Sequence, residues 1–191
     1  MLTVRDIVPG ARPTIEPKAI VHCDTAFTTD ERQQLFAAAD LWKRQTSGLA
    51  EVTLVFDVDF ASTSNIQNHV DLQHNMMLQL ESWMPAVSDE GTAKTLGFVS
   101  PSGGIHNPWH KPLTVGFVVD RVAPNGISDA TLKQIALHEF GHVFGVPHQL
   151  AMNAIMFPSA VKTDSVCLKR PDLAAFCQVN DCGTRRMYPC E

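Results

Sequence analysis

The sequence predicts an α+β domain in which a mixed sheet packs against two principal helices and an irregular tail follows. Three observations lead to this prediction: several short segments alternate apolar and polar residues as strands do, two longer segments show helical spacing, and the end of the chain has cysteines in place of periodicity. The predicted order of strand, helix, four strands and helix is typical of an α+β layer arrangement. The 191 residues suffice for one full-sized domain and are too few for two.

The first half of the chain is predicted to contain one helix between two strands. Residues 1–18 carry three prolines and are expected to form an extended arm. The apolar stretch at 18–24 is a short candidate strand. Thr28 and Glu31 form the T-x-x-E capping box that opens a helix, whose apolar residues then recur at helical spacing. The segment 52–60 alternates apolar and polar side chains, which is the pattern of a strand.

The second half is predicted to supply three more strands and the second helix. The segment 74–83 has features of both helix and strand, and we favour a strand because its leucines alternate with polar residues. Two short apolar segments, 95–100 and 113–119, are predicted as strands on either side of a loop that contains glycine and proline. Ser128 is a good N-cap for the helix that follows.

Charge and hydropathy argue against several classes of partner. The formal net charge of −5 and the pI of about 5.9 give no electrostatic basis for binding nucleic acid or an anionic membrane. No apolar stretch reaches the roughly eighteen residues that indicate a membrane span, so we expect none. The first part of the chain lacks the apolar core of a signal peptide, so the chain either stays inside the cell or has lost its export signal.

Cysteine usage favours an exported protein. Four of the five cysteines lie in the last twenty-five residues, namely Cys167, Cys177, Cys182 and Cys190. We predict two disulfides there, because the four contain no C-x-x-C pair of the kind found in zinc sites, with a metal site or free thiols as the alternatives. The pairing is open among three connectivities. Cys23 is expected to be a buried free thiol, and the alternative is a thiolate that caps a catalytic metal.

The segment HEFGHVFGVPH at 138–148 has the spacing of a metal site. His138 and His142 are four residues apart, so on a helix their imidazoles lie on one face and can bind one ion. Glu139 lies about 100° around the helix from His138, where a carboxylate can take a proton from a water on the ion. Chance is a poor explanation for these uncommon residue types at these positions, so we predict metal binding.

A third ligand requires the helix to end. Catalytic zinc usually keeps three protein ligands and one open position, so two histidines are too few. Gly145 permits the positive φ that ends a helix, and Pro147 discourages its continuation. His148 can then turn back toward the ion, which predicts three histidines around zinc with one side open.

The same segment matches H-E-x-x-H-x-x-G-x-x-H and therefore resembles the extended zinc signature of the metzincin metalloproteases. Met156, eight residues beyond His148, resembles the methionine turn of that clan. The order of predicted elements over roughly 19–160 is similar to the matrixin branch. The chain looks like a small secreted matrixin of the bacterial type.

The resemblance implies a fold and a domain plan. The fold would be α+β, with a twisted mixed five-stranded sheet, an active-site helix, a backing helix and a small irregular C-terminal subdomain that carries the disulfides. A single catalytic domain would extend over 1–191. Its parts would be the arm at 1–18, an upper subdomain at 19–145 with the sheet and zinc helix, and a lower subdomain at 146–191 with the methionine turn and the cysteines.

The resemblance also implies an activity. The chain would be a zinc endopeptidase that hydrolyses peptide bonds with metal-activated water. One catalytic zinc ion would bind His138, His142 and His148, and Glu139 would act as the general base. Met156 would pack beneath the imidazoles.

Substrate-binding residues follow from the same resemblance. The strand with Leu96, Gly97 and Phe98 would be an exposed edge to which an extended protein or peptide substrate adds. The pocket for the side chain after the cleaved bond is expected to accept an apolar group. Four residues would form its wall: Leu137, Pro158, Ser159 and Ala160.

Several alternatives remain open. A zinc amidase acting on cell-wall peptides would use the same chemistry, and a non-catalytic binding module would keep the fold, although the intact Glu139 argues against a module. His106 and His110 could bind a second ion, but solvated loop histidines are the simpler interpretation. Asp120 occupies one position of the family's structural ion sites, so a Ca²⁺ ion stays an open alternative. We expect a monomer that is secreted or otherwise outside the cytoplasm.

Overall fold

The computed structural model describes residues 18–58, 75–79, 97–101, 113–117, 129–158 and 166–190. The elements within these residues are β1 (Lys18–Asp24), α1 (Thr29–Gln45), β2 (Glu51–Val58), β3 (Asn75–Gln79), β4 (Gly97–Pro101), β5 (Leu113–Phe117), α2 (Asp129–Val143) and α3 (Arg170–Val179). The segment predicted at 74–83 contains β3, so the choice of strand over helix there is confirmed. Several predicted features lie outside the described residues, namely residues 1–17 of the arm predicted at 1–18, Ser128, His106, His110 and Asp120.

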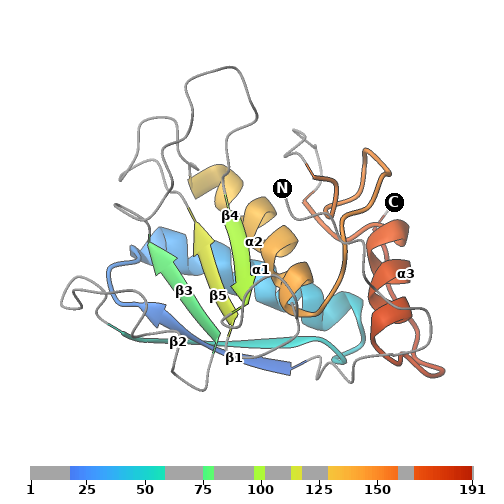
Figure 1. Cartoon of the computed structure of the whole chain (residues 1–191), viewed down its shortest axis with the longest axis horizontal. Helices are drawn as coiled ribbons and strands as arrows, with labels where there is room; N and C mark the ends of the chain where they lie inside the picture. The colour runs from blue at the N-terminus through green and yellow to red at the C-terminus, as the bar shows by residue number, and fades with distance from the viewer. Residues whose placement is uncertain are drawn as a thin grey trace.

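The strands form one mixed sheet in the order β2-β1-β3-β5-β4 (Figure 1). Strand β1 pairs in parallel with both β2 and β3, and β3 pairs in parallel with β5. Strand β4 runs antiparallel to β5 and has a partner on one side only among the described strands. Together with the helices, this sheet confirms the α+β class, and it places β4 at the edge nearest α2.

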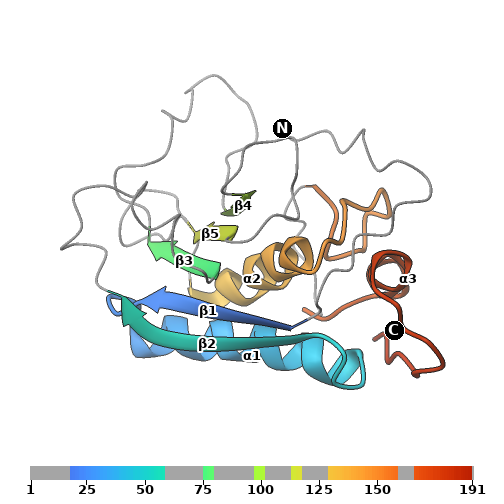
Figure 2. The same cartoon turned by 60° about the horizontal axis from the view of Figure 1, so that its bottom comes forward.

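Helices α1 and α2 pack against each other and against the sheet (Figure 2). Helix α1 begins with the predicted capping box, in which Glu31 N donates to Thr28 Oγ1 at 3.2 Å and Thr28 N donates to Glu31 Oε2 at 2.7 Å. Farther along α1, the buried Trp42 donates from Nε1 to the Leu137 carbonyl of α2 at 2.9 Å. This bond fixes α2 one residue before the metal motif. No helix in the described part of the chain is long and apolar enough to cross a membrane.

Three aromatic rings join the long helices to the C-terminal part of the chain. The ring of Trp42 lies 5.2 Å from that of Phe144 and 5.5 Å from that of Phe176, and Phe144 and Phe176 are 6.0 Å apart. All three side chains are fully buried. Burial of one such side chain contributes roughly 1.5–3 kcal/mol, and an edge-to-face pair adds about 0.5–1.5 kcal/mol. The cluster therefore attaches α3 firmly to the ends of α1 and α2.

Helix α3 is a correction to the sequence analysis, because the tail was predicted to be irregular. Pro171 lies in its first turn, where the missing amide proton is not needed. Asp172 accepts a hydrogen bond from Lys169 N at 2.7 Å, which caps the start of the helix. Leu173 and Phe176 then bury one face. A face of so few residues is too short to show as periodicity in the sequence.

The tail contains two disulfides, and the structure defines their pairing. Cys167 is bonded to Cys190 and Cys177 to Cys182, with Cα atoms 6.2 Å and 5.3 Å apart. Cys23 is free and fully buried in β1, as expected of a core thiol. Burial raises the pKa of this thiol to about 12.

Candidate metal centre

Helix α2 ends in a turn that reverses the chain within the metal motif. Gly145 N donates to the His142 carbonyl at 2.9 Å, and Val146 N donates to the Gly141 carbonyl at 2.8 Å. These two bonds define a Schellman motif, which requires a left-handed residue just past the helix end. Gly145 supplies it with a φ of 81°. The chain that leaves the turn carries His148 back toward the helix.

The turn brings three imidazoles together. The Nε2 atom of His138 lies 3.1 Å from that of His142 and 3.2 Å from that of His148, and the last two are 3.2 Å apart. Nitrogen ligands about 2.0–2.1 Å from a tetrahedral zinc ion would be separated by about 3.3 Å. The spacing of the three nitrogens therefore fits a single ion. Among the described residues, these histidines form the one group of side chains that meets the spacing of a metal site.

The second nitrogen of two of these rings shows which form the imidazoles take. His138 Nδ1 donates to the Ile155 carbonyl at 2.8 Å, and His142 Nδ1 donates to the Val146 carbonyl at 2.9 Å. A neutral imidazole with its proton on Nδ1 has a lone pair on Nε2, so these lone pairs face one another. Such an arrangement is repulsive without a cation and suits zinc.

Burial favours the neutral, metal-binding form of all three rings. Loss of hydration lowers the pKa of His138 to about 4 and that of His142 to about 3, and neighbouring histidines add to both shifts. Burial also lowers the pKa of His148. The donor set therefore consists of neutral nitrogens, which is the chemistry that zinc prefers in proteins.

Glu139 lies next to His138 on α2 and is buried, with 5% of its surface exposed. Its Oε2 atom is inaccessible to solvent and has no hydrogen-bond partner among the described residues. Burial raises the pKa of this carboxyl group to about 8. A buried carboxyl oxygen without a partner is costly in a structural role, and this one belongs to the residue that follows His138 on α2.

The methionine turn supports His138 through the backbone. Ile155 N and Met156 N donate to the two carboxylate oxygens of Asp172 at 3.1 Å and 2.9 Å, and the Ile155 carbonyl accepts from His138. Asp172 is fully buried, and burial raises the pKa of its carboxyl group although the backbone donors act in the opposite direction. No role for Asp172 was predicted from the sequence. The signal that could have identified it is the position of an acidic residue in the first turn of a helix, since Asp172 lies three residues after Lys169, the N-cap of α3.

Met156 packs where the motif has a glycine. A Cβ atom on Gly141 would overlap Met156 Sδ and lie 2.9 Å from Met156 Cε and 3.2 Å from Trp42 Cζ2. Met156 is fully buried, so its side chain has little freedom to move away. Gly141, which lies between the two histidines of α2 in sequence, was assigned no role from the sequence, whereas the structure shows that it makes room for the methionine side chain.

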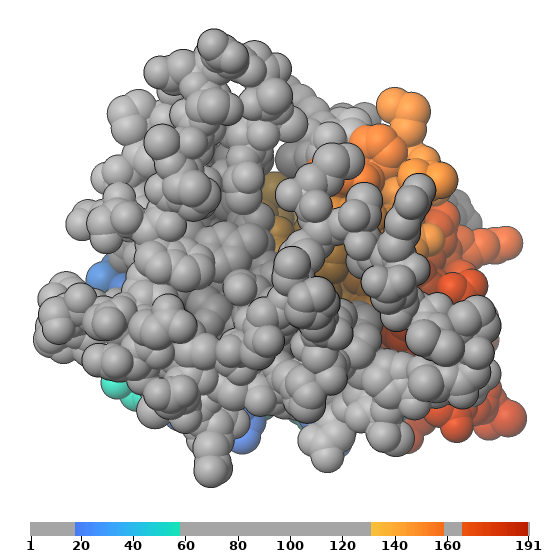
Figure 3. Space-filling view, viewed as in Figure 1, coloured from blue at the N-terminus to red at the C-terminus, as the bar shows by residue number. Residues whose placement is uncertain are grey.

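The predicted substrate-binding residues are only partly described. Gly97 and Phe98 lie in β4, where they pair with Phe117 and Gly116. Leu137 is fully buried in the core, and Pro158 is exposed. Leu96, Ser159 and Ala160 lie outside the described residues. Figure 3 shows atoms of α2 at depth and the loop that follows α2 at the surface beside them.

The α+β fold and the three-histidine cluster together define the class of metzincin zinc metallopeptidases. A comparison with family models supports this class and makes it more specific, since the Matrixin model matches residues 13–179. The chain belongs to the matrixin family of zinc-dependent metallopeptidases. A search of curated proteins found no match.

Gly145→Val is expected to weaken zinc binding by about tenfold. Valine is strained at a φ of 81°, and relief of that strain shifts the turn that carries Val146 and His148. Zinc affinity is measured by competition with a chromogenic chelator. Gly183→Val is the matched control, because Gly183 also has a positive φ, of 53°, but lies in the tail. An equal loss of affinity in both variants would contradict the prediction.

Asp172→Asn is expected to weaken zinc binding by at least about tenfold, because one amide oxygen cannot accept from three backbone donors as two carboxylate oxygens do. The chelator competition is repeated, with thermal unfolding of the zinc-free protein measured alongside. Asp181→Asn is the control, since Asp181 accepts from Gly183 N at an exposed turn. Zinc affinity that is unchanged in a folded Asp172→Asn protein would show that Asp172 does not support the site.

Proposed function

We propose that the chain is a zinc-dependent endopeptidase in which His138, His142 and His148 bind one catalytic zinc ion and Glu139 is the general base. The observation that carries the proposal is the convergence of three Nε2 atoms, 3.1 to 3.2 Å from one another. Membership of the matrixin family already makes the chain a zinc metallopeptidase that acts on proteins. The roles of individual residues and cleavage within the substrate chain are the added steps.

The chemistry divides between the ion and the carboxylate. Bound zinc supplies a Lewis acid that polarises the scissile carbonyl and makes a water molecule more acidic. Glu139 accepts a proton from the attacking water and delivers it to the leaving amine. Its partnerless Oε2 atom supports this role, because it offers an acceptor that no other contact among the described residues uses. His138 and His142 would hold the ion through their Nε2 lone pairs, because their Nδ1 protons are bound to carbonyls.

An extended protein or peptide substrate adds to β4 as a further strand along Leu96, Gly97 and Phe98. The position of β4 at the edge of the described sheet, in contact with α2, supports this route. Main-chain hydrogen bonds then hold the substrate with little dependence on its sequence. The wall of the pocket for the apolar side chain after the cleaved bond consists of four residues: Leu137, Pro158, Ser159 and Ala160.

The chain acts as one secreted, monomeric catalytic domain with the arm at 1–18, an upper subdomain at 19–145 and a lower subdomain at 146–191. The two disulfides support a location outside the cytoplasm, since such bonds persist in oxidising compartments. Trp42, Phe144 and Phe176 support a single domain, because their rings pack the ends of both long helices against α3.

Glu139→Gln is expected to bind about one zinc ion per chain with affinity near that of the wild type and to lose roughly 10²- to 10⁴-fold in activity. Glutamine keeps the size of the side chain but cannot accept the proton. Metal content and cleavage of an unfolded protein are measured for both proteins. Glu51→Gln is a control, because Glu51 is a surface residue paired with Lys43.

Three outcomes would overturn the proposal. The first is a wild-type protein that contains no zinc, and the second is a Glu139→Gln variant that cleaves as fast as the wild type. The third is a wild-type protein that cleaves cell-wall peptides and leaves unfolded proteins intact. The last result would favour the zinc amidase.

A further inference from the structure

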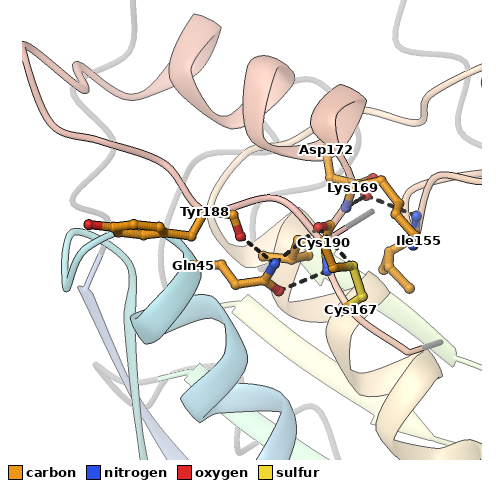
Figure 4. The surroundings of a disulfide bond; sticks show 8 residues. Gln45, Ile155, Cys167, Lys169, Asp172, Tyr188 and Cys190 are labelled. Carbon is orange, nitrogen blue, oxygen red and sulfur yellow. Dashed lines mark hydrogen bonds between the residues drawn. A yellow bond between two sulfur atoms is a disulfide. The ribbon is translucent and has the colours of Figure 1, made fainter.

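Gln45, the last residue of α1, fastens two distant segments of the tail (Figure 4). Its Nε2 atom donates to the Leu168 carbonyl at 3.1 Å and to the Tyr188 carbonyl at 2.7 Å, and its Oε1 atom accepts from Leu168 N at 2.9 Å. Tyr188 N in turn donates to the Gln45 carbonyl at 2.9 Å. The side chain is buried, so both of its amide donors and its acceptor are used within the protein.

The disulfide Cys167–Cys190 closes the same junction. Cys167 precedes Leu168, and Cys190 lies two residues after Tyr188, so each half of the disulfide flanks a residue that Gln45 holds. Cys190 N also donates to the Leu168 carbonyl at 3.1 Å. The segment around Leu168 is therefore held by one covalent bond and by hydrogen bonds from α1 and the end of the tail.

This segment leads directly to the support of the metal centre. Lys169 N, next to Leu168, donates to Asp172 at 2.7 Å. Asp172 accepts from the amides of Ile155 and Met156, and the Ile155 carbonyl accepts from His138. Hydrogen bonds joined by short stretches of backbone thus connect the segment fixed by the disulfide to a predicted zinc ligand.

The second disulfide offers a comparison within the same tail. Cys177 and Cys182 are five residues apart in sequence, against 23 for Cys167 and Cys190. Their bond joins the end of α3 to the turn that follows it. None of the hydrogen bonds between Gln45 and His138 involves either cysteine.

We propose that the Cys167–Cys190 disulfide is a redox-sensitive positioning element of the zinc site. A dithiol reductant breaks the S–S bond, leaves thiols on Cys167 and Cys190, and is itself oxidised to a disulfide. The end of the tail is then held to Leu168 by hydrogen bonds alone, so the Lys169 amide is fixed less firmly against Asp172 and the methionine turn holds His138 less rigidly. Zinc affinity falls as a result. The proposal rests on the zinc site proposed above and adds its regulation.

The test compares two double variants that each lack one disulfide. Cys167→Ser with Cys190→Ser is expected to bind zinc about tenfold more weakly than the wild type, whereas Cys177→Ser with Cys182→Ser keeps wild-type affinity. Chelator competition is run without reductant, so that no added thiol binds zinc. Wild type that has been reduced with a dithiol and desalted without oxygen is expected to match the first variant.

The outcomes separate this inference from the proposed function. Equal weakening in both double variants overturns the inference, because a general loss of stability then explains the effect. Wild-type affinity in a folded protein that lacks the Cys167–Cys190 bond also overturns it. If that variant fails to fold, the Cys177→Ser with Cys182→Ser protein, which keeps the Cys167–Cys190 bond, is measured before and after reduction with a dithiol: weaker zinc binding after reduction supports the inference and unchanged binding overturns it. Oxidised wild type that binds no zinc overturns the proposed function itself.

Discussion

Neutral imidazole nitrogens that face one another within hydrogen-bond distance repel each other unless a cation lies between them. The two turns that follow α2 nevertheless keep the three histidine rings in this arrangement. His138 and His142 are kept in this orientation by hydrogen bonds from their other ring nitrogens to backbone carbonyls. One carbonyl belongs to the turn at Gly145 and the other to the methionine turn. The turn at Gly145 therefore has two effects, because it brings His148 back and also fixes the ring of His142.

The methionine turn is itself held by the buried side chain of Asp172, and burial of that side chain costs hydration free energy. Hydrogen bonds to a charged group contribute about 1.5–3 kcal/mol each, and Asp172 accepts three from backbone amides. Burial nevertheless raises the pKa of this carboxyl group, so the loss of hydration outweighs the donors. Asp172 is thus better understood as a device that fixes the position of Ile155 and Met156 than as a source of net stability. The aromatic cluster of Trp42, Phe144 and Phe176 supplies stability nearby.

The sequence predicted the parts of this arrangement that depend on local chemistry. A capping box at Thr28, alternation in β2 and the need for a positive φ at Gly145 are all readable within a few residues. The contacts that hold the site could not be predicted, because they involve backbone carbonyls and amides. Nearly every residue has these groups, so the sequence does not indicate which of them will pair. Gln45 shows the limit well: a glutamine at the end of an amphipathic helix is unremarkable, yet its partners are 123 and 143 residues away. The resemblance to matrixins predicted the fold and the metal ligands, but neither α3 nor the disulfide pairing was predicted from the sequence.

The three predicted zinc ligands come from two different parts of the chain. Two ligands come from α2, which Trp42 ties to α1, while the third lies beyond the turn at Gly145. A cation among the three nitrogens would therefore link the helical layer to the segment that leads into the tail. Gln45 links the helical layer to the tail at another point, and Asp172 links the tail to the turn that carries Ile155 and Met156. Because a ligand that binds only the folded state stabilises it, ion binding and closure of the tail would reinforce each other, each reducing the conformational freedom that the other must remove.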